Sequence, residues 1–242
     1  MSGTLSLVGV GPGDPELLTL KAARLLREAD VIVYPVSNED TTIALDIARS
    51  HVNQAALLEA IHFPMSVGAG TGKPMVTNAV YDEAAARIAT HLAANRNVVY
   101  LCEGDPLFYG TAIYLLSHFH DENSQAVEVV PGITSITAAA AAIPFPLVAK
   151  AEPLTVLTGM TSERLLRDTL EEGGSFAILK LGRHYDRVRA LLDEFSLSER
   201  AFYVERASAA DQKIMRVRDL PSGEKPYFSL ILRYSGAEHW LP

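Results

Sequence analysis

The chain has 242 residues, of which 48% are hydrophobic and 21% charged, a composition typical of a globular protein and unlike that of a disordered chain. Its formal net charge of −8 argues against a nucleic-acid partner that is held by broad phosphate neutralisation. Residues 1–20 lack the features of a signal peptide, and no apolar run is long enough to span a bilayer. We therefore expect a cytoplasmic protein with no membrane association.

The first half of the chain predicts a repeated strand–turn–helix pattern. Strands that end in turns rich in glycine and proline are expected over residues 5–10, 31–34, 98–102 and 127–130. Helices are expected over residues 16–28, 42–49, 78–94, 111–116 and 136–143. This alternation predicts a doubly wound, largely parallel sheet with its turns gathered along one edge, where ligands of such sheets bind.

Two features of this half bear on its chemistry. The single cysteine, Cys102, lies in an apolar run, which favours a buried structural thiol over a nucleophile and excludes an internal disulfide. The first turn contains Gly9, Gly11 and Gly13, but Asp14 stands where a dinucleotide fingerprint needs glycine, and Pro12 lacks a backbone N–H. A nicotinamide dinucleotide site is therefore not predicted.

Residues 61–78 combine glycines and prolines with no apolar periodicity, which predicts a long surface loop. Such a loop is either a plain linker or a lid over a cleft. Prolines between Pro144 and Pro153 interrupt the pattern again. We place a domain boundary there, which gives domains of residues 1–145 and 146–242 and an α/β architecture for each.

The second half predicts strands over residues 155–157, 176–181, 201–205 and 227–232. Its helices are expected at residues 162–170 and 185–195. It also contains the clearest basic cluster of the chain, formed by Lys180, Arg183, His184, Arg187 and Arg189. This cluster is either a solvated helix face with charge pairs to Asp186, Asp193 and Glu194, or part of a local pocket for an anionic ligand. No group of cysteines and histidines has zinc-ligand spacing, so no metal is predicted.

Three stretches, in this order and at this spacing, carry a resemblance to a known family. They are residues 8–22 (VGVGPGDPELLTLKA), Gly104-Asp105-Pro106, and Val130-Pro131-Gly132-Ile133-Thr134-Ser135. Over nearly its whole length the chain resembles the tetrapyrrole (corrin/porphyrin) methylases. The resemblance implies two α/β domains with the active cleft between them, S-adenosylmethionine (SAM) as the methyl donor, a tetrapyrrole substrate and a homodimer.

Within this family, Gly104 to Thr111 (GDPLFYGT) and Tyr34-Pro35-Val36 are most similar to enzymes that methylate carbon 20 of precorrin-2 on the way to vitamin B12. Uroporphyrinogen methylases carry Tyr-Asp at the second site, where the aspartate is a proposed proton acceptor. Because Pro35 stands there, that base does not carry over, and no catalytic residue is singled out. Two alternatives remain open: the same reaction on the cobalt-containing substrate of the anaerobic route, and a non-catalytic tetrapyrrole-binding protein.

Transferred residue by residue, the resemblance implies SAM contacts at Pro12, Glu103, Gly104, Asp105, Phe108, Thr134, Ser135, Leu181 and Ala207. In that arrangement the Asp105 carboxylate would hold the ligand ammonium or ribose hydroxyls, and Phe108 and Leu181 would form apolar walls. The substrate carries eight carboxylates, which call for local cations. The candidate substrate-binding residues are Tyr109, Lys150, Arg183, His184 and Arg206.

Overall fold

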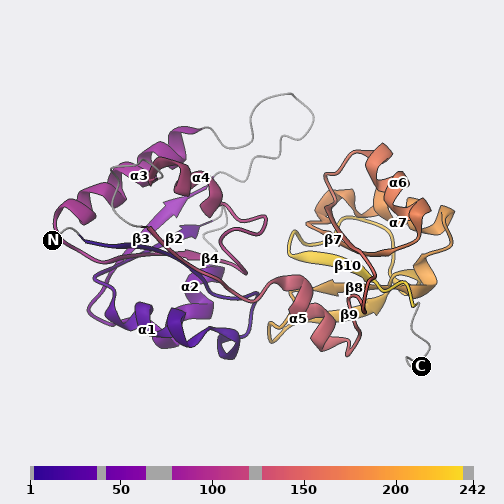
Figure 1. The fold of residues 1–242 in the computed structure, drawn as a ribbon, viewed down its shortest axis with the longest axis horizontal. Coiled ribbons are helices and arrows are strands. Elements are labelled where there is room, and N and C mark those ends of the chain that lie inside the picture. The colour runs from indigo at the N-terminus through magenta and orange to yellow at the C-terminus, as the bar shows by residue number, and fades with distance from the viewer. Residues whose placement is uncertain (1–2, 37–41, 64–77, 120–126, 237–242) are drawn as a thin grey trace. The chain divides into compact units, whose positions relative to one another are not determined.

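A computed structural model describes residues 3–36, 42–63, 78–119 and 127–236 of the chain. The chain forms two compact units, Met1–Thr134 and Ser135–Pro242 (Figure 1). The possible lid between residues 61 and 78 lies almost entirely outside the described residues.

The first unit contains a five-stranded sheet in which every pairing is parallel, as predicted for a doubly wound fold. The strand order is β3-β2-β4-β1-β5. The strands are β1 (Leu5–Gly9), β2 (Val31–Val36), β3 (Leu57–His62), β4 (Val98–Cys102) and β5 (Val127–Val130).

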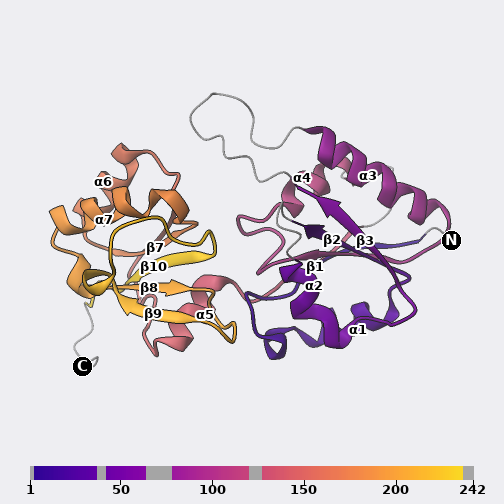
Figure 2. The same ribbon diagram turned by 180° about the vertical axis from the view of Figure 1, so that it is seen from behind.

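Helices cover both faces of this sheet (Figures 1 and 2). Helices α1 (Leu20–Glu28) and α2 (Ile43–Ala48) lie on one face, and α3 (Asn78–Ala93) and α4 (Ala112–Leu116) lie on the other. Successive strand residues alternate between these two cores, so Val99 and Leu101 pack with α1 and α2 while Tyr100 packs with α3 and α4. This alternation explains why β4 is apolar at every position.

Strand β3 was not predicted from the sequence. Its residues, Leu-Leu-Glu-Ala-Ile-His, favour a helix or a loop at least as much as a strand. It forms because its backbone pairs along the whole of β2, from Val31–Leu57 to Val36–His62, at the edge of the sheet. Pro35 is tolerated in β2 because β4 pairs with that strand only at residues 31–33.

The second unit contains a mixed five-stranded sheet in the order β6-β7-β10-β8-β9. Only β6 and β7 pair in parallel, and the other pairings are antiparallel. The strands are β6 (Leu154–Thr158), β7 (Ser175–Leu179), β8 (Ala201–Glu205), β9 (Lys213–Arg216) and β10 (Ser229–Arg233). The short edge strand β9, exposed along most of its length, was not predicted.

Helices α6 (Glu163–Glu172) and α7 (Tyr185–Glu194) contribute Leu166, Val188 and Leu192 to the core of the second unit. Helix α5 (Ser135–Ala142) packs against β10. After α5, the Phe145 ring contacts Phe202 on β8 at a centroid distance of 5.3 Å. The compact units therefore divide before α5, whereas the domain limits predicted from the prolines are 1–145 and 146–242.

Candidate functional site

Three turns that the sequence singled out leave the same edge of the first sheet. We call residues 10–15 the first turn, residues 103–110 the second turn and residues 131–134 the third turn. They follow β1, β4 and β5, which are parallel neighbours in the sheet, so all three begin at its carboxyl edge. This edge is where open α/β sheets bind ligands.

The first and second turns are joined by backbone hydrogen bonds. The Gly104 N–H donates to the Gly11 carbonyl at 2.8 Å, and the Gly11 N–H donates to the Gly104 carbonyl at 3.3 Å. Both glycines have positive φ angles, 79° for Gly11 and 67° for Gly104, which other residues adopt only with strain. The pairing requires glycine at both positions.

The third turn packs directly on the second. A Cβ atom added to Gly132 would lie 2.0 Å from the Gly104 carbonyl oxygen, and one added to Gly9 would lie 2.6 Å from the same oxygen. The Gly104 carbonyl oxygen thus occupies the space that side chains on Gly9 and Gly132 would need. These motif glycines serve close packing between the turns.

Asp105 has partners that the sequence did not predict. One carboxylate oxygen accepts the N–H of Leu107 at 2.9 Å, and the other accepts the N–H of Gly132 at 3.1 Å. The carboxylate expected to hold a ligand ammonium or ribose is therefore bonded to the backbone of the second and third turns.

The remaining candidates of the first unit lie around these turns. Pro12, Glu103 and Thr134 are half-buried at the carboxyl edge, and Phe108 is half-buried with its ring 5.0 Å from that of Tyr109 in an edge-to-face contact. Tyr109 is 42% exposed and has a φ angle of 55°. Ser135 begins α5 and belongs to the second unit.

In the second unit, five candidate residues lie at one edge of the sheet. Leu181, Arg183 and His184 follow the carboxyl end of β7, and Arg206 and Ala207 follow that of β8. Strand β10 lies antiparallel between β7 and β8, so its beginning is at the same edge. There the Phe228 carbonyl accepts the Arg206 N–H at 2.8 Å. Lys150 does not join this group along the chain, because it precedes the opposite end of β6.

The side chains of Leu181 and Ala207 are buried. Leu181 has no exposed surface and packs in the core with α6 and α7, and Ala207 is 5% exposed. The apolar wall expected from the Leu181 side chain is therefore not formed in this structure.

The basic cluster consists in part of structural arginines. The Arg187 guanidinium donates to the carbonyls of Gly159 at 2.6 Å and Thr161 at 2.8 Å, which ties the end of β6 to α7. Arg189 forms an ion pair with Asp193 at 2.9 Å and donates to the Leu220 carbonyl at 2.6 Å. The interpretation as a helix face with ordinary charge pairs is thus confirmed for Arg189.

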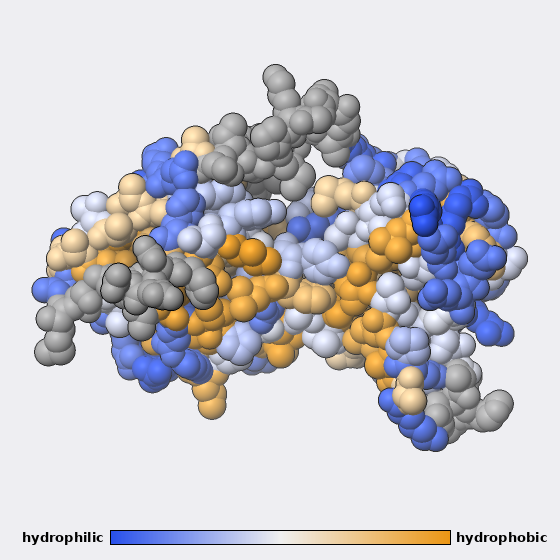
Figure 3. All heavy atoms as spheres, turned by 45° about the horizontal axis from the view of Figure 1, so that its top comes forward, coloured by the Kyte–Doolittle hydropathy of each residue, from blue (hydrophilic) through white to orange (hydrophobic). Residues whose placement is uncertain are grey.

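The other two acidic residues of that interpretation, Asp186 and Glu194, have partners outside the basic cluster. Arg167 on α6 pairs with Glu194 on α7 at 2.6 Å, and the Asp186 carboxylate accepts the Gly223 N–H at 2.8 Å. The exposed charges of α6 and α7 contribute to the hydrophilic surface on the right of Figure 3.

Two of the predicted substrate-binding residues, Arg206 and His184, are affected by neighbouring charges. The Arg206 guanidinium pairs with Asp211 at 2.7 Å, and that contact lowers the pKa of the Asp211 carboxyl. Burial, together with the charges of Arg183 and Arg187, lowers the pKa of His184. His184 is consequently a neutral imidazole near pH 7 in this structure, and not a standing positive charge.

Sequence reasoning missed Gly159 and the role of Arg187. A Cβ atom on Gly159 would lie 2.8 Å from the Lys180 carbonyl oxygen, so the end of β6 needs glycine to approach the segment after β7. A glycine directly after a predicted strand, the same signal as in the first three turns, was the available indication.

Cys102 is buried, as predicted, and burial raises its pKa well above the ordinary thiol value. It therefore remains a protonated thiol at neutral pH, unsuited to nucleophilic attack. Among the described residues, no three His, Cys, Asp or Glu side chains are grouped so as to hold a metal ion. The described helices include none with the length and apolarity needed to cross a membrane.

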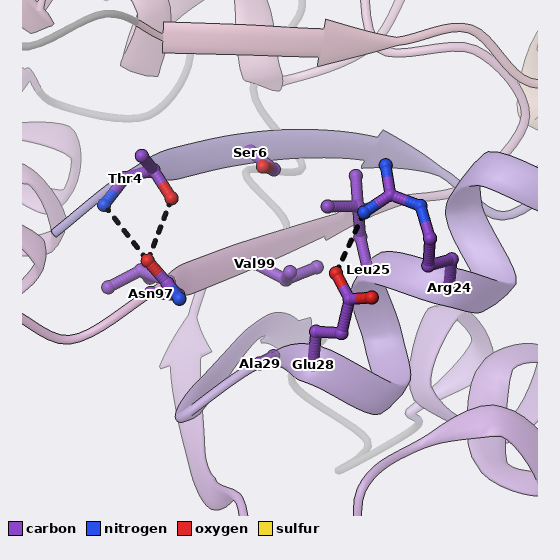
Figure 4. A pocket seen from close by; sticks show the side chains of 9 residues that line it. Thr4, Ser6, Arg24, Leu25, Glu28, Ala29, Asn97 and Val99 are labelled. Atoms are coloured by element: carbon purple, nitrogen blue, oxygen red, sulfur yellow. Dashed lines mark hydrogen bonds and ion pairs between the residues drawn. The ribbon is translucent and has the colours of Figure 1, made fainter.

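A hollow in the first unit lies at the opposite, amino end of β1 and β4, beside α1 (Figure 4). Four of its polar side chains pair with each other: the Asn97 amide oxygen accepts the Thr4 hydroxyl at 2.9 Å, and Arg24 pairs with Glu28 at 2.7 Å. No residue of the three turns lines it. The residues of the three motif turns therefore lie at the carboxyl edge of the sheet and not at this hollow.

The three turns occur within a segment, residues 4–220, that matches the family model described as Tetrapyrrole (Corrin/Porphyrin) Methylases. The chain belongs to this family. The resemblance seen in the sequence is thereby confirmed, and so is the mixed α/β architecture with two sheets.

Three curated relatives of this chain are cobalamin-biosynthesis and precorrin-2 methyltransferase proteins by name. Cobalamin biosynthesis protein CobIJ of Mycobacterium tuberculosis is 41% identical over 242 residues, which cover 99% of this chain and 47% of CobIJ. The chain thus spans about half the length of that relative. Precorrin-2 C(20)-methyltransferase of Sinorhizobium is 35% identical, covering 95% of this chain and 94% of the relative. Cobalt-precorrin-2 C(20)-methyltransferase of Salmonella typhimurium is 30% identical, covering 96% of each.

Solved structures of the family share the fold. The cobalt precorrin-4 methyltransferase CbiF superposes with a TM-score of 0.74 at 24% identity, covering 96% of this chain and 94% of CbiF. Uroporphyrin-III C-methyltransferase of Thermus thermophilus has a TM-score of 0.64 at 26% identity, covering 96% of this chain and 98% of the other. The latter structure holds S-adenosylhomocysteine, the product that SAM leaves after methyl transfer, which supports SAM as the family's methyl donor.

Proposed function

We propose that this methylase transfers a methyl group from SAM to carbon 20 of precorrin-2, giving precorrin-3A in cobalamin biosynthesis. The observation that carries the proposal is the assembly of the three family turns at one sheet edge, the second of which contains most of the Gly104 to Thr111 stretch. The 35% identity to the Sinorhizobium precorrin-2 C(20)-methyltransferase, over nearly the full length of both chains, supports the choice of substrate.

In this proposal the donor binds along the turns. Pro12, Glu103, Gly104, Asp105, Phe108, Thr134 and Ser135 contact SAM. The family resemblance also implies contacts at Leu181 and Ala207, both of which are buried in the second unit. The half-buried Phe108 ring supplies an apolar surface for the adenine. The positive φ of Gly104 and the absence of a side chain there allow backbone groups to approach the ligand closely.

The substrate side of the proposal rests on local cations in an acidic protein. Arg183, His184 and Arg206, which follow β7 and β8, face the propionate and acetate groups of the tetrapyrrole, and Tyr109 contacts the ring. Lys150 precedes the opposite end of β6 and is not included. His184 has a lowered pKa, so it enters as a hydrogen-bonding imidazole, and binding of a carboxylate would raise that pKa again. Arg206 already pairs with Asp211, so a substrate carboxylate would share its guanidinium.

The main task of the protein in methyl transfer is to position the two reactants. The nucleophilic carbon 20 attacks the methyl carbon of the sulfonium, a new C–C bond forms, the C–S bond breaks and S-adenosylhomocysteine leaves with the electron pair. The proton on carbon 20 is then lost to a base or to solvent. Holding the two reacting carbons in line and excluding water supplies the main rate gain.

A second candidate is the same reaction on the cobalt complex of the substrate, as in the anaerobic route. The 30% identity to the Salmonella cobalt-precorrin-2 C(20)-methyltransferase favours it, with 96% coverage of both chains. A third candidate is a tetrapyrrole-binding protein without catalysis. A site for a methyl donor argues against a pure carrier. For the active form we also propose a homodimer in the cytoplasm.

An anaerobic incubation with carbon-13 methyl-labelled SAM tests these candidates. The purified chain receives either metal-free precorrin-2 or its cobalt complex, and the product is identified by mass and by NMR. A label on carbon 20 from the metal-free substrate alone supports the proposal, and a label from the cobalt complex alone favours the second candidate. Tetrapyrrole binding without SAM binding or methyl transfer would favour the carrier.

A further inference from the structure

We propose that Asp105 is a positioning residue, whose carboxylate clamps the third turn against the second and so fixes the spacing of the backbone groups that receive SAM. The inference rests on the proposed function. It differs from the direct ligand contact that the family resemblance implied, because it assigns the carboxylate to the protein's own backbone.

The clamp is visible in the hydrogen bonds of both carboxylate oxygens. One accepts the Leu107 N–H at 2.9 Å within the second turn, and the other accepts the Gly132 N–H at 3.1 Å in the third turn. The second bond joins residues 27 positions apart in the chain. Bonds from backbone N–H groups to an ionised carboxylate are stronger than neutral ones, so this bridge holds both turns at once.

Close packing between the turns means that a loss of the Asp105 clamp would also affect the first turn. The Gly132 backbone sits so close to Gly104 that an added Cβ would lie 2.0 Å from the Gly104 carbonyl oxygen. That same oxygen accepts the Gly11 N–H of the first turn at 3.3 Å. A shift of the third turn away from Asp105 therefore changes the contact through which the first and second turns are also joined.

The side chain must be an aspartate for this role. Asparagine has the same shape but only one oxygen, so its amide nitrogen would face one of the two N–H donors. Glutamate keeps both oxygens and the charge but places them one methylene farther away. Asp105→Asn thus removes one clamp bond with little change in volume, and Asp105→Glu changes the geometry without losing the charge.

A matched control lies at the other end of the same sheet. The Asp30 carboxylate accepts the Asn97 N–H at 2.8 Å, a bond between residues 67 positions apart at the amino ends of β2 and β4. Asp30→Asn removes the same charge and disturbs the same kind of bond, away from the three turns.

The experiment measures amide hydrogen exchange of Gly132 by NMR in the ligand-free protein, and the affinity for S-adenosylhomocysteine by calorimetry. In Asp105→Asn we expect exchange at Gly132 to accelerate, and the affinity to fall, each by about tenfold, the change expected from one charge-assisted hydrogen bond. In Asp105→Glu we also expect faster exchange at Gly132 and a lower affinity for S-adenosylhomocysteine. Asp30→Asn accelerates exchange at Asn97 only and leaves the affinity within about twofold.

A nucleoside that lacks the amino-acid part, 5′-methylthioadenosine, separates positioning from direct contact. A displaced turn weakens both ligands by the same factor and accelerates Gly132 exchange. Loss of a carboxylate–ammonium contact weakens S-adenosylhomocysteine alone, and loss of a carboxylate–ribose contact weakens both ligands while Gly132 exchange stays unchanged. Unchanged Gly132 exchange in both Asp105 variants, or loss of affinity for S-adenosylhomocysteine alone, overturns the inference. If the wild-type chain binds neither ligand, the proposed function fails, while the exchange data still decide whether the clamp exists.

Discussion

The two sheets of this chain present candidate ligand groups at one edge each, but they build those edges differently. In the first unit, three glycine-containing turns pack backbone to backbone, and Asp105 bridges two of them. In the second unit, side chains brace the edge: Arg187 on α7 holds two carbonyls after β6, and Arg206 after β8 pairs with Asp211. Backbone packing constrains residue type strictly, whereas side-chain bracing allows many solutions.

The largest expected effect is that of Gly132→Ala. Its Cβ would meet backbone atoms at 2.0 Å, and no flexible side chain is available to move, so we expect a loss of about 2–3 kcal/mol of unfolding free energy, near the upper end for overpacking. Urea denaturation measures it. Gly174→Ala is the control, because its Cβ has only a Pro153 atom within 4 Å, at 3.9 Å. Equal stability of the two variants would contradict the backbone-packing account.

In the second unit the corresponding change is Arg187→Lys. A lysine cannot reproduce the guanidinium fork on the Gly159 and Thr161 carbonyls, and we expect a loss of about 1–2 kcal/mol. Thermal unfolding of Arg187→Lys beside the exposed Arg183→Lys measures the difference. If the two variants melt at the same temperature, the β6-to-α7 tie does not stabilise the unit.

Glu59 allows a pH test in the first unit. Burial opposes its ionisation, but hydrogen bonds from His91, at 2.7 Å, and from Arg87 outweigh burial and lower the pKa of the carboxyl below its ordinary 4.5. A lowered folded-state pKa stabilises the protein above the unfolded-state value, and this stabilisation is lost as the pH falls through the folded-state pKa. Glu59→Gln should therefore be less stable than wild type at pH 7, and the gap should close below pH 4.5.

Denaturant titrations across this pH range check the prediction for Glu59. A constant gap between wild type and Glu59→Gln would show that the carboxylate charge is not the stabilising element. Glu205 provides the comparison in the second unit: burial opposes its ionisation too, but hydrogen bonds from Lys213 and Tyr203 lower its pKa. Glu205→Gln should show the same pH dependence.

The smallest expected effect is that of Tyr109→Gly. Relief of the positive φ angle of 55° should stabilise the chain by up to about 1 kcal/mol, offset in part by the freer unfolded chain. Under the proposed function, loss of the ring should lower methyl transfer. Asn95→Gly is the control for the backbone, with a φ of 58° in the turn before β4. Stabilisation in Asn95→Gly but not in Tyr109→Gly would show that the Tyr109 ring contributes to folding.

Much of the first unit followed from the sequence, because apolar runs such as residues 98–102 and the turns after them reflect local rules. The edge strands β3 and β9 did not, because β3 exists through its pairing with β2 and β9 through its pairing with β8. Among the candidate site residues, Asp105 and the turn glycines could be picked out from their motifs, but their contacts with other turns could not. The buried position of Leu181 and the ion pair of Arg206 depend on residues distant in the chain, which one sequence does not reveal.

Cys102 offers a practical consequence of the fold. It is the only thiol of the chain and lies buried on β4, the central strand of the first sheet. A thiol reagent reaches it only when that strand separates from α3 and α4. The rate at which a thiol reagent labels Cys102 under native conditions therefore reports how often the first unit opens. This rate can be measured in each variant above without introducing a further cysteine.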